Sequence, residues 1–312
     1  MKKIAIVTEG GKEKGFGHIT RCLSLYQAFE ERGVVPNFII NGDESIARLF
    51  RGEKYCVLDW ADDEDTLFRL ITGADMAIVD SYIADRFFYD RIRKRVKLAV
   101  YFDDNNRMDY PNGVIINGNI YAPELGYEHS NGKEYLLGTK YLPQRKEFRD
   151  IDEKMIREDI ENVLVTFGGI EYSDIVYNMF EGIKSQVELN FHIVKPNEGF
   201  TSVKELLNLM QGADICISGG GQTLYELARV GVPTIGISFA DNQERNLKAW
   251  RDKGFLEYAG SQYHDNIVQN VVDAIDKLRC RRERLRQSVA GKKHVDGKGS
   301  ARIVEALLEK LK

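Results

Sequence analysis

The sequence predicts an α/β protein of two doubly wound, Rossmann-like domains with a cleft between them. Short apolar runs alternate with longer amphipathic segments, the pattern of parallel strands flanked by helices. A strongly charged segment at residues 143–161 interrupts this alternation, which then starts again. The length of 312 residues is long for one domain and sufficient for two.

In the first half, strands are expected at residues 3–8, 35–40, 76–80, 98–102 and 114–116. A helix is expected after Gly17, because the apolar residues that follow recur at helical spacing and form one face. These elements define a first domain at residues 1–148.

In the second half, strands are expected at residues 163–167, 191–194, 214–218 and 234–237, each followed by a helical segment. We place the second domain at residues 149–295 and a terminal helix at residues 296–312. Ser300, which follows a glycine-rich break, is expected to cap that helix.

The composition excludes several classes of protein. The net charge of -4 and the lack of a dense basic stripe argue against nucleic acid as a partner, and the basic run at residues 279–286 is expected to be a solvated helix face. No stretch has the length of a membrane span or of a signal-peptide core, so we expect a cytoplasmic protein without stable membrane insertion. The four scattered cysteines predict buried thiols rather than disulfides or a zinc site.

Polar residues that follow the strands of the first half are candidates for chemistry, because ligands of parallel sheets bind at the carboxyl ends of the strands. His18 lies at a helix start, where a neutral imidazole could accept a proton or merely close a turn. Asp80 and Tyr82 follow one strand, and Asp104 follows another. These acids could orient an imidazole, bind hydroxyls or cap helices; a metal site at Asp103 and Asp104 lacks further carboxylates at suitable spacing.

A glycine-rich turn in the second half predicts an anion site. Gly219, Gly220 and Gly221 follow a strand, and a helix begins near Gln222 and Thr223. Glycines let backbone N–H groups approach an anion closely, and a helix N-terminus adds partial positive charge, so a diphosphate would fit here. One turn into the helix, Glu226 could accept both hydroxyls of a ribose or be an ordinary exposed glutamate.

Two further segments of the second half belong to this candidate site. Gln243 and Asn246 lie one turn apart at a helix start and could present amides to sugar hydroxyls, although Asp241 or Asn242 could instead cap that helix. Gly168 and Gly169 form another tight turn after a strand.

With these residues described, the chain resembles a known family over nearly its full length: the UDP-sugar hydrolases of pseudaminic acid biosynthesis (PseG) and the related spore coat polysaccharide proteins (SpsG), in the MurG-like, GT-B group. The most specific matching stretch runs from Gly15 to Leu23. The others are Asp80-Ser81-Tyr82, Phe102-Asp103-Asp104, residues 117–122, Gly168-Gly169, the glycine turn leading to Glu226, and Asn242-Gln243.

The resemblance implies a GT-B-like fold, nucleotide binding by the second domain and a sugar directed at the first. His18 would be the base that activates water, releasing UDP and a free, inverted sugar, with Asp80, Tyr82 and Asp104 completing the catalytic set. No metal or cofactor is implied. The implied substrate is a UDP-linked 2,4-diacetamido-2,4,6-trideoxy hexose. The expected substrate-binding residues are Gly15, Gly17, Arg21, Asn119, Gly168, Gly169, Gly220, Gly221, Gln222, Thr223, Glu226, Asn242, Gln243 and Asn246.

Two other functions remain open at this stage. A GT-B glycosyltransferase would use the same base and donor, with an acceptor hydroxyl in place of water. A non-catalytic nucleotide-sugar-binding module would retain the binding residues without the chemistry. A nicotinamide enzyme is disfavoured because the GxGxxG fingerprint and its acidic partner are missing.

Overall fold

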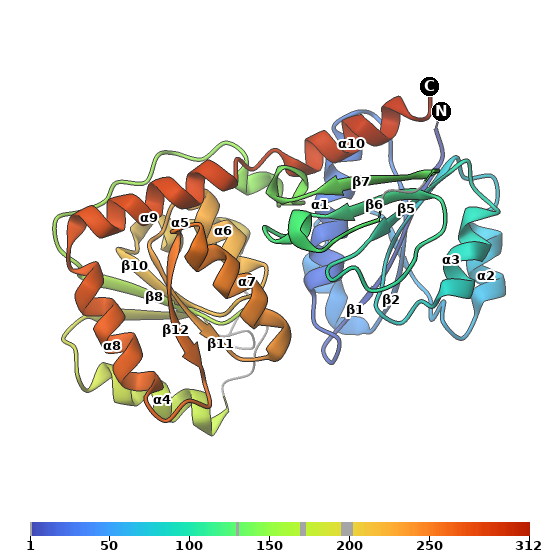
Figure 1. The fold of residues 1–312 in the computed structure, drawn as a ribbon. Helices are drawn as coiled ribbons and strands as arrows, with labels where there is room; N and C mark the ends of the chain where they lie inside the picture. The colour runs from blue at the N-terminus through green and yellow to red at the C-terminus, as the bar shows by residue number, and fades with distance from the viewer. Residues whose placement is uncertain (1, 129–130, 169–172, 195–201) are drawn as a thin grey trace. The chain divides into compact units, whose positions relative to one another are not determined.

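The structure is a computed structural model that describes residues 2–128, 131–168, 173–194 and 202–312. The chain divides into two compact units (Figure 1). Unit 1 comprises Met1–Lys146 and Gly297–Lys312, and unit 2 comprises Glu147–Asp296. Gly169, one of the residues expected in the site, lies outside the described residues.

Unit 1 contains a seven-stranded parallel sheet with the order β3-β2-β1-β4-β5-β6-β7. The strands are β1 (Ile4–Gly10), β2 (Asn37–Gly42), β3 (Tyr55–Val57), β4 (Met76–Asp80), β5 (Leu98–Phe102), β6 (Gly113–Asn117) and β7 (Lys133–Leu137). The strand order reverses between β1 and β4, which is where doubly wound sheets bind ligands.

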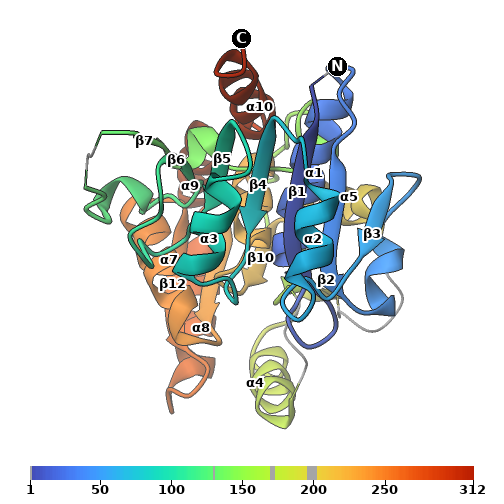
Figure 2. The same ribbon diagram turned by 90° about the vertical axis from the view of Figure 1, so that its right-hand side faces the viewer.

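Helices cover both faces of this sheet, because successive residues of each central strand point to opposite faces and both sets are apolar. Ile4 and Ile6 pack with the α1 (Gly17–Glu30) and α10 (Gly299–Glu309) side chains. Ala5 and Val7 pack with those of α2 (Glu64–Leu70) and α3 (Arg86–Arg93) on the other face, the face that Figure 2 shows in front. Short 3-10 helices η1 (Glu44–Leu49), η2 (Ala122–Glu124) and η3 (Thr139–Tyr141) complete the unit.

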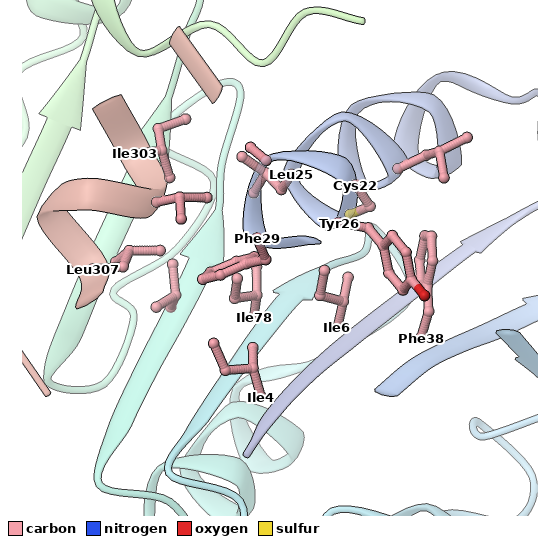
Figure 3. Close-up of a cluster of buried hydrophobic side chains, with 14 of the residues drawn as sticks. Ile4, Ile6, Cys22, Leu25, Tyr26, Phe29, Phe38, Ile78, Ile303 and Leu307 are labelled. Carbon is pink, nitrogen blue, oxygen red and sulfur yellow. The ribbon is translucent and has the colours of Figure 1, made fainter. Parts of the chain in front are cut away.

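The terminal helix α10 is part of the core of unit 1. Ile303 and Leu307 point toward Phe29 and Leu25 of α1 (Figure 3), and they are fully buried. The prediction that Ser300 caps this helix is wrong. The helix already begins at Gly299, and the Ser300 hydroxyl instead accepts from the Gln144 backbone N–H at 3.1 Å, tying the helix start to the chain before the unit boundary.

Unit 2 contains a five-stranded parallel sheet with the order β12-β11-β10-β8-β9. Its strands are β8 (Asn162–Thr166), β9 (Asn190–Val194), β10 (Ile215–Ser218), β11 (Thr234–Ser238) and β12 (Leu256–Ser261). Its helices are α4 (Asp174–Lys184), α5 (Val203–Gly212), α6 (Thr223–Val230), α7 (Asp241–Asp252), α8 (Ile267–Leu278) and α9 (Arg281–His294), and the 3-10 helix η4 (Lys146–Phe148) precedes the first strand. The strand order reverses between β8 and β10. The prediction of two doubly wound parallel-sheet domains is therefore confirmed.

Two expectations about individual side chains are corrected. The basic run of α9 is not simply a solvated face, because Arg284 is fully buried and donates to the carbonyl oxygens of Leu278 and Arg157. The cysteines are free thiols, but only Cys22 and Cys216 are buried; the Cys56 side chain is partly exposed and Cys280 is exposed. Within the described residues, no helix combines the length and the apolar composition that a membrane crossing requires.

Candidate active site

The candidate catalytic residues of unit 1 gather at the carboxyl ends of β1, β4 and β5. His18 is the second residue of α1, Asp80 ends β4, and Asp104 follows β5 by two residues. Their elements are distant in sequence but adjacent at the point where the strand order reverses. The parallel topology thus brings together side chains that the sequence only placed at separate strand ends.

His18 and Asp80 form a buried pair. The His18 Nδ1 atom lies 2.7 Å from Asp80 Oδ1, and the side chains are 14% and 1% exposed. Asp80 only accepts hydrogen bonds and so favours the tautomer with the proton on Nδ1, which leaves the Nε2 lone pair to accept a proton. The Nη2 of Arg21, which is a donor, lies 3.1 Å from the same Nδ1 atom. The His18–Asp80 pair has the arrangement by which a carboxylate orients a histidine base.

Arg21 joins Asp80 to Asp104. It lies one helical turn after His18, and its Nη2 donates to Asp80 Oδ1 at 2.6 Å while its Nη1 donates to Asp104 Oδ1 at 2.8 Å. Burial raises the pKa of both carboxylates, but the charge and hydrogen bonds of Arg21, joined by His18 at Asp80 and by the Tyr82 hydroxyl at Asp104, lower each pKa below its usual value. Both acids therefore remain ionised at neutral pH, so two negative charges surround one guanidinium.

Tyr82 and Asn119 complete the network around Asp104. The Tyr82 hydroxyl donates to Asp104 Oδ2 at 2.6 Å, and Asn119 Nδ2 donates to Asp104 Oδ1 at 3.0 Å. Partial burial and the Asp104 carboxylate raise the pKa of Tyr82, so its hydroxyl stays protonated. The Tyr82 ring meets the His18 ring edge-on at 4.6 Å between centroids.

The Asp103 carboxylate forms hydrogen bonds within the protein. Its Oδ2 accepts from the Tyr127 hydroxyl at 2.7 Å, and its Oδ1 accepts from the backbone N–H of Arg107 at 3.2 Å. Its oxygens are therefore directed at protein donors. Among the described residues, no group of three or more His, Cys, Asp or Glu side chains has an arrangement that could hold a metal ion.

Sequence reasoning missed Glu9, the penultimate residue of β1. Its side chain is 3% exposed, and it accepts hydrogen bonds from the Ser81 hydroxyl and the Tyr82 backbone N–H. In the sequence, Glu9 is indicated by an acidic residue near the carboxyl end of a largely apolar strand. The loop after it, with Gly15 in the left-handed region (φ +78°), leads to Gly17 at the start of α1.

In unit 2 the predicted glycine turn connects β10 to α6 beside the strand-order reversal. A Cβ atom at Gly220 would lie 2.8 Å from the Gln243 carbonyl oxygen and 2.9 Å from Leu247 Cγ. A Cβ atom at Gly221 would meet nothing within 4 Å. Gly220 is thus required by the close approach of α7, whereas Gly221 borders open space. Gly168, which follows β8, has a left-handed φ of +68°.

Gln243 and Asn246 support this turn. Gln243 Oε1 accepts from the Gly220 N–H at 3.1 Å, and Asn246 Nδ2 donates to the Gly220 carbonyl at 2.8 Å. Asn246 is buried, and its Oδ1 accepts from the Tyr225 hydroxyl at 2.7 Å. The N-cap of α7 is Ala240, with no side-chain capping bond, while Asn242 is exposed in the first turn. Contacts of these amides with a sugar remain a prediction.

Glu226 lies in the first turn of α6 and is only 3% exposed. The alternative of an ordinary exposed helix glutamate is therefore wrong. Gln222 occupies the N-cap position of α6, and Thr223 is its first residue. A buried carboxylate one turn from a glycine-rich helix start combines an acceptor for hydroxyls with donors for an anion.

Comparison with known proteins supports both the fold and the resemblance. Residues 152–303 match the glycosyltransferase family 28 C-terminal domain. An uncharacterized protein of Methanocaldococcus jannaschii is 25% identical over 265 residues, covering 75% of this chain and 55% of that protein. Spore coat polysaccharide biosynthesis protein SpsG of Bacillus subtilis is 23% identical over 338 residues, covering 97% of each chain.

A third relative is the Helicobacter pylori protein named pseudaminic acid cytidylyltransferase and UDP-2,4-diacetamido-2,4,6-trideoxy-beta-L-altropyranose hydrolase. It is 24% identical over 257 residues, covering 78% of this chain and 46% of that protein. The predicted resemblance is confirmed. The chain spans about half the length of the Methanocaldococcus and Helicobacter relatives and nearly all of SpsG.

Solved structures confirm the GT-B-like fold with two parallel-sheet α/β domains. MurG of Acinetobacter baumannii superposes with a TM-score of 0.72 at 13% identity, covering 99% of this chain and 100% of that chain. S. aureus MnaA, in a co-structure with UDP, superposes with a TM-score of 0.70 at 15% identity, covering 100% of this chain and 97% of that chain.

Proposed function

We propose that this protein is a UDP-sugar hydrolase in which His18 activates water. The observation that carries the proposal is the buried His18–Asp80 pair, which leaves Nε2 as the proton-accepting atom. The negative charge of Asp80 and Asp104 stabilises the positive charge that the imidazole gains, and Arg21 keeps both carboxylates in place.

In the proposed reaction, His18 Nε2 removes a proton from water while the water oxygen attacks the anomeric carbon. The bond between that carbon and the diphosphate oxygen breaks, and its electron pair leaves with UDP. A single displacement of this kind inverts the anomeric configuration. The water proton, held by His18, is then released to solvent, so the products are UDP and a free sugar.

We assign nucleotide binding to unit 2. The backbone N–H of Gly221 and the N-terminus of α6 would bind the diphosphate, because a helix start carries partial positive charge and the Gly220 N–H already donates to Gln243. Glu226 would accept the ribose hydroxyls. Asn246 and Gln243 hold the turn in the required shape.

For the sugar, we propose a 2,4-diacetamido-2,4,6-trideoxy hexose, delivered to surface polysaccharide or nonulosonic acid biosynthesis. Support comes from the names of the Helicobacter and Bacillus relatives. The Tyr82 side chain, which is 47% exposed and lies against His18 with its hydroxyl bonded to Asp104, offers an apolar contact that methyl groups of such a sugar would use.

The test is UDP release from a panel of UDP-sugars that includes the diacetamido-trideoxy hexose, without any acceptor. Wild type should release UDP from this substrate, and His18→Ala should not, although it still binds UDP. Binding of the substrate without release would contradict the hydrolase assignment.

A glycosyltransferase is the second candidate, favoured by the match of residues 152–303 to a glycosyltransferase domain. The same panel separates the two functions when acceptor sugars are added: a transferase releases UDP only with an acceptor. A binding module without chemistry would release UDP under neither condition.

A further inference from the structure

We infer that Glu9 is a positioning residue that fixes Tyr82 against His18 and Asp104. The inference rests on the proposed function for its kinetic test and on the structure alone for its spectroscopic test. Within the described residues, Glu9 forms no hydrogen bond with His18 or Asp104; it acts through the turn that follows β4.

Glu9 uses both carboxylate oxygens on this turn. Oε1 accepts from the backbone N–H of Tyr82 at 2.8 Å and from that of Ile83 at 3.3 Å, while Oε2 accepts from the Ser81 hydroxyl at 2.6 Å. The turn therefore has its backbone donors satisfied by a side chain of a neighbouring strand. β1 and β4 are parallel neighbours with Thr8 opposite Asp80, so Glu9 reaches the residues directly after Asp80.

The Ser81 hydroxyl connects Glu9 to the next residues of the turn. Its hydroxyl donates to Glu9 and accepts from the backbone N–H of Ala84 at 2.9 Å and of Ile83 at 3.1 Å. Glu9 and Ser81 are 3% and 2% exposed, so water does not replace these bonds easily. The turn is thereby held from inside the protein, and only the Tyr82 and Ile83 side chains reach the surface.

The orientation of Tyr82 depends on this turn. Its backbone is held by Glu9, and Arg107 Nη1 donates to its carbonyl at 2.9 Å. From this position the hydroxyl reaches Asp104 at 2.6 Å and the ring packs edge-on against His18. Loss of the Glu9 carboxylate should therefore let Tyr82 move away from both residues.

The kinetic test compares Glu9→Ala, Glu9→Gln and Asp214→Asn with wild type. Asp214 is the matched control, because it is also 3% exposed and its carboxylate accepts from two backbone N–H groups, those of Glu161 and Asn162, at the opposite end of a strand. Glu9→Ala should lower kcat about 100-fold with little change in UDP affinity, since small misplacements at a reacting centre have effects of this size.

Glu9→Gln keeps one oxygen for the Tyr82 N–H, so kcat should fall less than in Glu9→Ala but still measurably, by about three- to tenfold. It also keeps the test decisive if Glu9→Ala does not fold. Asp214→Asn should lower the melting temperature without changing kcat. If Glu9→Gln and Asp214→Asn lowered the melting temperature equally and left kcat unchanged, Glu9 would contribute only to stability. That result would overturn the inference.

The spectroscopic test requires no turnover. The His18 ring-proton resonance, assigned by its loss in His18→Ala, should shift in Glu9→Gln and Glu9→Ala because the Tyr82 ring current moves. It should stay in place in Asp214→Asn. An unshifted resonance in folded Glu9 variants overturns the inference. If wild type hydrolyses no UDP-sugar but the resonance shifts as expected, the proposed function fails and the positioning role stands.

Discussion

The candidate site of unit 1 consists of polar and charged side chains, whereas the candidate site of unit 2 consists mainly of backbone groups. In unit 1, ionised and hydrogen-bonded side chains from separate strand ends interlock around Asp80 and Asp104. In unit 2, the site is a glycine backbone turn supported from behind by the amides of Gln243 and Asn246. Charged side chains can move protons, whereas backbone N–H groups bind anions. This difference is the basis on which we propose that unit 1 carries the chemistry and unit 2 binds the nucleotide.

The largest effect is expected for His18→Ala. Loss of a general base should lower kcat by about 10²–10⁴-fold while the dissociation constant of UDP, measured by calorimetry, stays near the wild-type value. His192→Ala is the matched control, because this histidine is exposed on β9 of unit 2, where its Nε2 atom lies 3.2 Å from Asn162 Oδ1. If His18→Ala lowered UDP affinity by as large a factor as it lowered kcat, the proposal that unit 1 carries the chemistry and unit 2 binds the nucleotide would be contradicted.

The reverse pattern is expected for Glu226→Gln. Loss of a charged hydrogen-bond acceptor for ribose should weaken UDP binding by about 10- to 100-fold. The value of kcat at saturating substrate should change far less than in His18→Ala. A large fall in kcat with unchanged UDP affinity would place Glu226 in the chemistry instead.

Paired glycine substitutions test whether the unit 2 site depends on close packing of its backbone. Gly220→Ala places a Cβ atom against α7 and should destabilise unit 2 by about 1–3 kcal/mol and weaken UDP binding. Gly221→Ala places its Cβ atom in open space and should leave thermal unfolding near wild type. Similar melting temperatures for the two variants would contradict the packing argument.

The smallest effect concerns alkaline stability, which should distinguish the units. In unit 1, burial raises the pKa of Tyr89, Tyr101, Tyr110 and Tyr127 above the unfolded value of about 10. The folded state then holds protons that the unfolded state releases, so this stability is complete below pH 10 and is lost as the pH rises above it.

Unit 2 should differ from unit 1, because two of its buried groups oppose each other between about pH 8 and 10. Burial lowers the pKa of Lys154 to about 8, below the unfolded value of about 10.4, so the Lys154 contribution to stability rises with pH across this window. Burial also raises the pKa of the Cys216 thiol above the unfolded value of about 8.5, so the Cys216 contribution falls with pH above that value and offsets the rise. Denaturant unfolding measures both trends when it is followed by Trp60 fluorescence in Trp250→Phe for unit 1 and by Trp250 fluorescence in Trp60→Phe for unit 2. Parallel pH dependence of the two signals would contradict them.

Much of the fold was predictable because the central strands are continuous apolar runs. The predicted strands at 76–80 and 98–102 coincide with β4 and β5. The edge strands β3, β7 and β12 were not predicted, since each carries polar or small residues and takes part in the sheet through pairing with a neighbour rather than through its own pattern.

The candidate site was predictable only in part. Strand ends indicated His18, Asp80 and Asp104, but the role of Arg21 in joining the two carboxylates depends on tertiary geometry that no local spacing encodes. Glu9 was not predicted for the same reason, because its hydrogen-bond partners lie 72 or more residues away in the sequence. The prediction for Ser300 failed because its hydroxyl forms a hydrogen bond with the Gln144 backbone instead of capping the helix.

The most direct test of His18-activated water is hydrolysis of the UDP-sugar in oxygen-18-labelled water, with early-time proton NMR of the released sugar. We predict an inverted anomer at first appearance and no label in the phosphates of UDP, because the bond that breaks joins oxygen to the anomeric carbon. Label in the UDP phosphates, or a retained anomer, would contradict the account.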